Sequence, residues 1–518
     1  MADDIDDPAR VTTPRFNLVD EPWIPVRWLN GEHGELGIRD TLLQADRIAE
    51  IQDASPLVVA ALHRFLLAVL YRALEGPTDE QVAKTWFKQG WPPGKIAAYL
   101  EKWRDRFWMF DRQYPFGQIP TFEPRTWRAW TVLAAEHNAD NAKVLFDHVD
   151  VNRAGAITPA QAARWLLATQ TFSVSCGKSE LSHTGTAPSA TAVMALPLGG
   201  TMFDTLSYSL VPQNRLLLAG DLPIWEREPE TLEALKNGCE RTVSGHADRY
   251  TWRIRAVRLQ ADADLTVSRL AFASGVGPQR EQQSDPMLSY RIDEKNGRLP
   301  VIFREKGIWR DFDSLLPDAG GCAPQVIEHA VGLGRAVPER FPSTVMVAGQ
   351  SNNKAKIEYW RMERFSLPSA LTGDRMVRAE IRNLLAAAEE AQTALWLACK
   401  SFARNLLSRG EREPAAKDVS NFLRQMPATD TYWSSLEPRF HQILAEYTSD
   451  RDPDDIRLLW LRHVRSVMNA AWNAYASSVA TGDAWAIRAL AQAEAPVLRH
   501  IAKLNDEISR LEPHKEPA

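Results

Sequence analysis

The sequence predicts an α+β protein: a large mixed domain over residues 1–370, followed by an antiparallel four-helix bundle over residues 371–518. Two observations support this class. Between residues 190 and 350, short β-like runs alternate with turns, whereas from about Arg375 apolar side chains recur every three or four residues. Short loops separate the amphipathic segments, which is typical of an antiparallel bundle. A chain of 518 residues is long enough for at least two domains.

The N-terminal part is expected to combine a core helix with strands at a sheet edge. Residues 16–27 predict two strands around a Pro-containing turn, and the prolines restrict this segment to an edge or a turn because proline cannot donate to a ladder. Residues 57–74 carry a broad apolar stripe at helical spacing and predict a core helix. The aromatic-rich residues 107–118 predict a buried connection. Two shorter helices are expected, at 79–89 and 95–107.

A well-marked helix begins near residue 158. Thr158 suits the N-cap, Pro159 the first helical position and Gln161 the third, and the helix is expected to run to about residue 171. Strand-like runs follow in an α+β region, at 206–211, 250–259 and 299–304.

Residues 172–191, directly after that helix, are mostly small or polar. Loops of this length within a compact domain are usually functional or disordered. Gly177, Lys178 and Ser179 place a backbone without a Cβ beside a cation and a hydroxyl, which suits close approach to a phosphate or a base edge. A phosphate-binding P-loop is excluded because Phe172 stands where a second glycine is needed. A surface connection without function is the alternative.

A second informative run follows a strand-like segment at 343–347. Gly349 and the pair Asn352 and Asn353 favour a tight turn, and Lys354 places a cation beside it. Amides and a long cationic side chain at a turn can donate to base acceptors and contact phosphates in a DNA groove. The alternative is a basic surface hairpin that contacts no DNA.

Four amphipathic segments make up the C-terminal part. The first begins at about residue 375 and ends at Gly410, and Pro438 must begin or kink the second. A third is expected over 456–475, and a fourth over 487–508 with an interruption at Pro496.

Composition limits the classes of function. The net charge of −5 attracts no nucleic acid overall, so any such binding must use local basic patches. The four cysteines form no Cys-x-x-Cys pair, and scattered thiols are typical of a reducing cytoplasm. We expect a cytoplasmic protein without a signal peptide, a membrane-spanning segment, a cofactor or a metal. No His-Glu-x-x-His or Gly-x-Ser-x-Gly motif occurs, so we do not expect an enzyme.

Four features in this order resemble the CasA-type large subunit of Cascade, the type I-E CRISPR surveillance complex. They are Asn17-Leu18 with Trp23-Ile24-Pro25-Val26, Phe110 with Pro115-Phe116-Gly117-Gln118, Gly349 with Asn352-Asn353 and Ala355, and the terminal helices. Together they span nearly the whole chain.

The resemblance implies a non-catalytic subunit that recognises the protospacer-adjacent motif of double-stranded target DNA from the minor groove. Guide RNA pairing then reads the target sequence. The implied DNA contacts are a glycine loop, a lysine and a hairpin wedge. On this chain they match Ser175, Cys176, Gly177 and Lys178; Lys295; and Asn353, Lys354 and Ala355.

One departure concerns the wedge, which is a glutamine in the family. Lys354 occupies the matching position here, and Gln350 lies nearby. Either Lys354 separates the strands with its aliphatic stem, or Gln350 does so in a shifted register.

The resemblance also implies partners beyond the target DNA. A loop that contacts a backbone subunit and the 5′ handle of the guide RNA matches Phe146, His148 and Asn152. The helical bundle is expected to contact the small subunits, and a helicase-nuclease is recruited to this subunit. Two other hypotheses stay open: a stand-alone nucleic-acid-processing enzyme with residues 172–191 as an active-site lid, and an α-helical scaffold without DNA contact.

Overall fold

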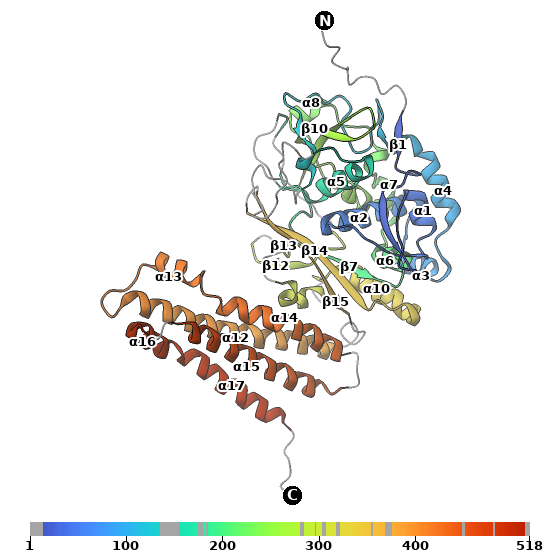
Figure 1. Cartoon of the computed structure of the whole chain (residues 1–518). Helices are drawn as coiled ribbons and strands as arrows, with labels where there is room; N and C mark the ends of the chain where they lie inside the picture. The colour runs from blue at the N-terminus through green and yellow to red at the C-terminus, as the bar shows by residue number, and fades with distance from the viewer. Residues whose placement is uncertain are drawn as a thin grey trace. The chain divides into compact units, whose positions relative to one another are not determined.

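The computed structural model describes residues 14–134, 155–174, 180–182, 185–279, 284–295, 297–302, 307–316, 322–353, 356–367, 375–447, 451–479 and 482–512. Contacts divide the chain into two compact units. The first comprises Met1–Ile308 with Pro317–Phe365, and the second Trp309–Leu316 with Ser366–Ala518. Helices and strands are mixed in the first unit, whereas the second is helical (Figure 1). The mixed helix-and-sheet class is confirmed. The domain functions expected for 1–370 and 371–518 stay predictions.

The first sheet has β2 (Ile24–Trp28) at its centre, between β3 (His33–Leu36) and β4 (Ile48–Ile51). The expectation that Pro25 lies at an edge or in a turn is therefore wrong. The physical reason is that β4 pairs with β2 only from Val26 onward, so the missing N–H of Pro25 falls at the end of that ladder. The Pro25 carbonyl still accepts a hydrogen bond from the Gln52 backbone N–H at 3.1 Å.

The predicted core helix is confirmed as α2 (Pro56–Leu74). Ser55 caps it by accepting a hydrogen bond from the Val58 backbone N–H. Contrary to expectation, α2 has the length and composition of a membrane-spanning helix. In its most apolar window, 94% is buried inside the protein, as in the core helix of a folded unit. The helices α3 (Glu80–Gln89) and α4 (Pro93–Lys102) follow, and α4 ends before the predicted limit of 107.

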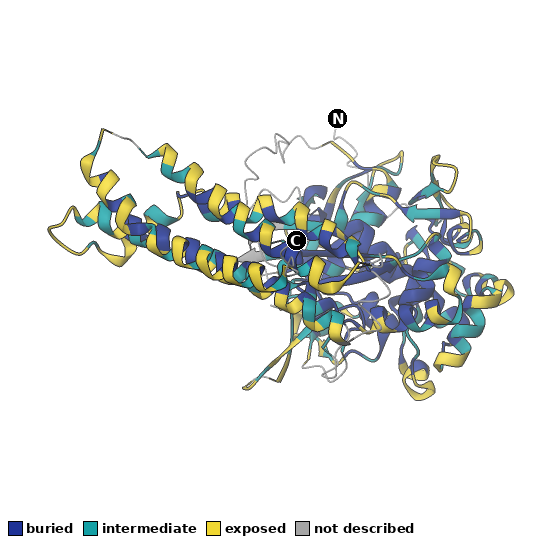
Figure 2. Ribbon diagram, turned by 90° about the horizontal axis from the view of Figure 1, so that it is seen from below, coloured by how far each residue is buried: buried dark blue, intermediate teal, exposed yellow. Residues whose placement is uncertain are grey.

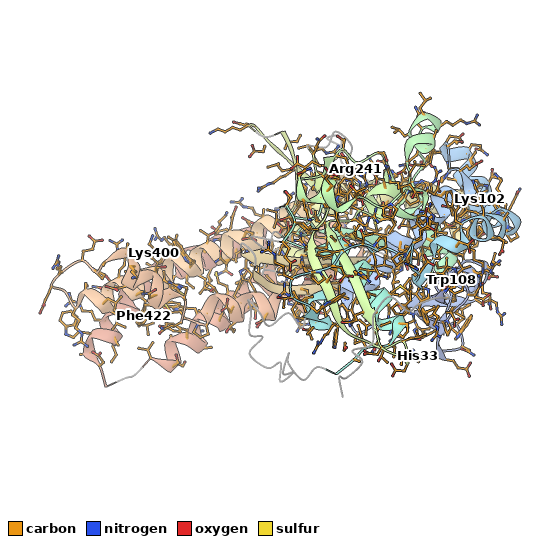
Figure 3. The ribbon with its side chains drawn as sticks, turned by 90° about the horizontal axis from the view of Figure 1, so that it is seen from above. His33, Lys102, Trp108, Arg241, Lys400 and Phe422 are labelled. Atoms are coloured by element: carbon orange, nitrogen blue, oxygen red, sulfur yellow. The ribbon has the colours of Figure 1, made fainter. Side chains whose placement is uncertain are left out.

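The aromatic connection over 107–118 is largely buried, as predicted, except for the exposed Arg112 and Gln113. Its strand β5 (Trp108–Phe110) pairs with β1 (Arg15–Asn17). The rings of Phe107 and Phe116 stack with centroids 5.6 Å apart. The guanidinium of Arg104 lies 5.3 Å from the ring centroid of Trp108. Trp108 is labelled in Figure 3.

Helix α5 (Pro159–Phe172) confirms the predicted start at residue 158. The Thr158 hydroxyl accepts from the Gln161 backbone N–H, and the Gln161 side chain accepts from the Thr158 backbone N–H. The helix packs against α2.

Residues 206–211 are not a strand but lie mostly in α6 (Met202–Ser209). Apolar residues at alternate positions imitate a strand there, but Thr201 caps a helix by accepting from the Asp204 backbone N–H. The other predicted runs overlap β9 (Arg255–Ala261), β13 (Gly297–Pro300) and β14 (Thr344–Asn353).

Four more groups of strands occur among the described residues of the first unit. One sheet has the order β15-β14-β7, a second has the order β6-β10-β9, β12 forms a hairpin with β13, and β11 pairs with β8 in parallel. Their further bounds are β7 (Met194–Leu198), β15 (Lys356–Ser366), β6 (Arg128–Ala129), β10 (Val267–Ser274) and β12 (Tyr290–Asp293). The other elements are α1 (Ile38–Leu43), α7 (Arg215–Gly220), α8 (Leu232–Lys236), α9 (His246–Tyr250), α10 (Gln325–Ala336), β8 (Glu240–Arg241), β11 (Gly277–Pro278) and the 3-10 turns Arg104–Arg106, Trp130–Leu133, Ile224–Glu226 and Pro338–Arg340. The 3-10 segment Ile308–Leu315 belongs to the second unit from Trp309 onward.

The second unit contains counterparts of all four predicted helices. Its helices are α12 (Arg375–Ser408), α13 (Ala416–Leu423), α14 (Ala428–Glu446), α15 (Pro453–Ser478), α16 (Ala484–Ala493) and α17 (Ala495–Leu511). Buried residues follow one side of the long helices and exposed residues the other (Figure 2). Pro438 lies inside α14 and does not begin it. The expected interruption near Pro496 separates α16 from α17. Their arrangement as an antiparallel four-helix bundle stays a prediction.

Candidate nucleic-acid interface

Strand β7 connects two hairpins that are distant in sequence. On one side it pairs with β14, from Met194 opposite Ala348 to Leu198 opposite Thr344. On its other side, the Val193 N–H donates to the Val301 carbonyl at 2.9 Å, and the Ala195 N–H donates to the Met287 carbonyl at 2.8 Å. Residues 287 and 301 flank the β12–β13 hairpin. Both hairpins are therefore attached to one strand (Figure 1).

Lys295 lies in the exposed turn between β12 and β13. Its backbone N–H donates to Oδ1 of Asp293 at 3.0 Å, and Gly297 has a φ of +74°, a conformation that glycine adopts without strain. Arg291 and Arg298 are exposed on the same hairpin. The structure thus presents the Lys295 side chain at a tip that carries further cations.

Gly349, Asn352 and Asn353 were expected in a tight turn, but they lie in β14, and β15 begins at Lys356. Asn353 ends β14, although its side chain lies outside the described part, as do Lys354 and Ala355. Gln350 is 0% exposed, and its Nε2 donates to the Phe172 carbonyl. A strand-separating wedge must reach the DNA, so the burial of Gln350 argues against the alternative that placed Gln350 there. Lys354 stays the predicted wedge.

The predicted glycine loop, Ser175, Cys176, Gly177 and Lys178, lies outside the described residues. Both of its flanks are described and joined to each other. The Ala187 N–H donates to the Ser173 carbonyl at 2.9 Å. The guanidinium of Arg255 donates to the Val174 carbonyl at 2.6 Å. The segment between residues 174 and 187 therefore begins and ends at the C-terminus of α5.

A buried ion pair fixes these segments to the core, and sequence reasoning missed it. Arg64 of α2 lies 2.8 Å from the carboxylate of Asp285. Ser189, which follows the glycine-loop segment, donates to the same carboxylate at 2.8 Å. The Asp285 N–H donates to the hydroxyl of Tyr290, the first residue of β12, at 2.7 Å. The sequence did contain a signal for this pair: Arg64 lies within an apolar helical segment, and a buried arginine there requires a buried partner.

The electrostatics of this pair favour the ionised form of Asp285. Burial alone would raise the pKa of its carboxyl group. The charges of Arg64 and Arg249, with hydrogen bonds from the Met287 N–H and the Ser189 hydroxyl, instead lower this pKa to about 2. Asp285 therefore carries a negative charge at neutral pH, although it is buried.

Phe146, His148 and Asn152 also lie outside the described residues. The described residues on either side of this segment pair with β10. Ala129 of β6 pairs with Arg269, and Ile157 exchanges backbone hydrogen bonds with Val267 at 3.0 and 2.8 Å. Within the described part of the chain, no group of three or more His, Cys, Asp or Glu side chains is arranged to hold a metal ion.

Comparisons with known proteins agree over nearly the whole chain. A family model described as CRISPR-associated protein Cse1 matches residues 17–471. CRISPR-associated protein CasA/Cse1 from Thermus thermophilus is 33% identical over 506 residues, which cover 95% of this chain and 99% of that protein.

Solved structures show the same fold. The structure of Thermus thermophilus CasA (Cse1) is similar with a TM-score of 0.80 and 31% identity, covering 95% of this chain and 100% of that one. A chain of a CRISPR RNA-guided surveillance complex is similar with a TM-score of 0.73 and 20% identity, covering 95% and 100%.

Proposed function

Since the chain belongs to the Cse1 family of CRISPR-associated proteins, we propose that it is the large subunit of a type I-E surveillance complex, Cascade. In this complex it recognises the protospacer-adjacent motif of double-stranded DNA from the minor groove and helps to open the duplex. Guide RNA pairing then reads the rest of the target. The full-length similarity to CasA and to a chain of an RNA-guided surveillance complex supports the proposal.

One observation supports the DNA-binding part of the proposal: described residues connect the three candidate segments to one another. The Lys295 hairpin and the hairpin that continues to Lys354 are attached to β7, and Gln350 joins the second hairpin to the helix from which the glycine loop begins. Three short segments that are connected in this way can act together on a single stretch of duplex.

The chemistry of the tips suits the minor groove. There, A·T and T·A pairs both present only acceptors, so lysine and amide donors read a permissive motif. Lys295 supplies a cationic donor, and the peptide groups of Ser175–Lys178 supply backbone donors. Asn353 and Ala355 flank Lys354 at the duplex end. Unstacking there costs a few kcal/mol per step, which the motif contacts offset.

The other roles follow from the same family membership. Phe146, His148 and Asn152 contact a backbone subunit and the 5′ handle of the guide RNA. The second unit packs as an antiparallel four-helix bundle against the small subunits, and the protein provides a docking platform for the helicase-nuclease. It acts in the cytoplasm as a non-catalytic subunit, without a cofactor and without contact to a membrane.

Fluorescence anisotropy with a labelled duplex tests the proposal. The chain alone should bind feebly, and the chain assembled with the guide-loaded remainder of the complex should bind tightly only when the motif is present. Equal binding of duplexes with and without the motif by the assembled complex contradicts motif recognition. Turnover of small nucleic-acid substrates by the chain alone would instead favour the enzyme hypothesis.

A further inference from the structure

Gln350 is a buried polar residue that strand pairing does not explain. Its side chain is 0% exposed, its Nε2 donates to the Phe172 carbonyl, and its Oε1 has no hydrogen-bond partner among the described residues. Leaving a buried acceptor unpaired costs about 1–3 kcal/mol, so the Oε1 atom gives no reason for glutamine at this position. The single bond to Phe172 is therefore what distinguishes glutamine at this position.

The bond joins the end of α5 to β14 on the side of β14 that faces β7, while β15 pairs with the other side of β14. Phe172 is the last residue of α5, and its carbonyl is one of the final four that lack a donor within the helix. Strand β14 is paired with β7 only as far as Ala348, and Gln350 lies two positions beyond. Beyond the last residue paired with β7, the Gln350 amide therefore connects this side of β14 to α5.

The connected elements lead to two of the segments that are expected to contact DNA. Ser173 follows Phe172 directly, and its carbonyl accepts from the Ala187 N–H, which closes the base of the glycine-loop segment. Asn353 lies three residues after Gln350, which is about 10 Å along an extended strand. A small displacement at Gln350 is therefore carried to the end of β14.

We propose that Gln350 is a positioning residue that sets the separation between the glycine-loop segment and the β14–β15 hairpin, and so sets motif discrimination. This inference rests on the proposed function. Gln350 itself touches no DNA in this role; it acts through the Phe172 carbonyl. Its loss should leave the fold in place but allow the two segments to move independently.

Hydrogen exchange in the isolated full chain tests the link without DNA. Gln350→Met keeps the length of the side chain but removes the donor. Backbone amides of residues 173–174, 187 and 349–353 should exchange at least about fivefold faster than in the wild type. Gln213→Met is the matched control, because Gln213 is also buried and neither polar atom of its side-chain amide has a hydrogen-bond partner among the described residues. Unchanged exchange in Gln350→Met overturns the proposal.

Binding by the assembled complex tests the consequence. The ratio of affinities for duplexes with and without the motif should fall about tenfold in Gln350→Met and stay unchanged in Gln213→Met. A target opened in advance should bind as in the wild type. Equal discrimination by wild type and Gln350→Met overturns the positioning role alone, whereas a wild-type complex without motif preference overturns the proposed function as well. An equal loss on the opened target shows a purely structural role and also overturns the inference.

Discussion

Arg64 and Asp285 form an ion pair of 2.8 Å in which the side chains are only 2% and 1% exposed. The pair connects the core helix α2 to the segment that begins the Lys295 hairpin. Ser189 donates to the same carboxylate, so the end of the glycine-loop segment is held at the same point. One buried charge pair therefore joins two candidate DNA-binding segments to the core helix α2.

Replacing Asp285 by asparagine should destabilise the first unit strongly. The change leaves the guanidinium of Arg64 buried without its counter-charge, and breaking such a pair costs about 3–5 kcal/mol. Urea unfolding followed by tryptophan fluorescence measures the loss. Glu390→Gln is the control, because it breaks the exposed pair with Lys503 and should cost less than about 1 kcal/mol. Similar losses in both variants would contradict the role of the buried pair.

Two buried histidines should make the protein sensitive to mild acid. Burial lowers the pKa of His246 to about 3, reinforced by Arg249 and Arg64, and burial lowers the pKa of His63 to about 4. Because the folded-state pKa is depressed, the unfolded chain binds more protons once the pH falls below about 6.5. The contribution of neutral His246 to the free energy of unfolding is fully present above about pH 6.5 and is lost progressively as the pH falls to about 3.

His246→Phe should reduce this acid sensitivity. Between pH 6.5 and 4, the slope of the free energy of unfolding against pH should be smaller than in the wild type by about 1.4 kcal/mol per pH unit. The reason is that the variant takes up one proton fewer on unfolding. Urea unfolding at a series of pH values measures the slope. His33→Phe changes an exposed side chain on β3 and should leave the slope unaltered (Figure 3). An unchanged slope in His246→Phe would assign the acid sensitivity to other groups.

Local signals in the sequence were sufficient for elements whose cause is local. The capping residues Thr158 and Gln161 predicted the start of α5, and the apolar stripe predicted α2, because helix formation depends on neighbouring residues. The central position of Pro25 was missed, since it depends on where β4 stops pairing. The burial of Gln350 was missed for the same kind of reason: its partner Phe172 is 178 positions away in the chain.

Lys295→Ala should weaken target binding by the assembled complex by about 1–3 kcal/mol, the size of one lost base contact. The exposed ammonium at the β12–β13 turn is the proposed donor to the minor groove. Anisotropy with a motif-bearing duplex measures the change. Lys102→Ala, which removes an exposed lysine on α4, is the control for loss of charge and should leave the affinity nearly unchanged. Unchanged affinity in Lys295→Ala would remove Lys295 from the interface.

Lys354 should separate the strands through its aliphatic stem, now that Gln350 is known to be buried. Lys354→Ala removes the stem and should weaken binding of an intact motif-bearing duplex by the complex. It should leave binding of a target opened in advance unchanged, because no step needs to be unstacked there. Lys354→Met keeps an apolar stem of similar length and should retain most of the affinity for the intact duplex. If methionine fails as badly as alanine, the ammonium group and not the stem carries the interaction. If alanine binds the intact duplex like the wild type, Lys354 is not the wedge.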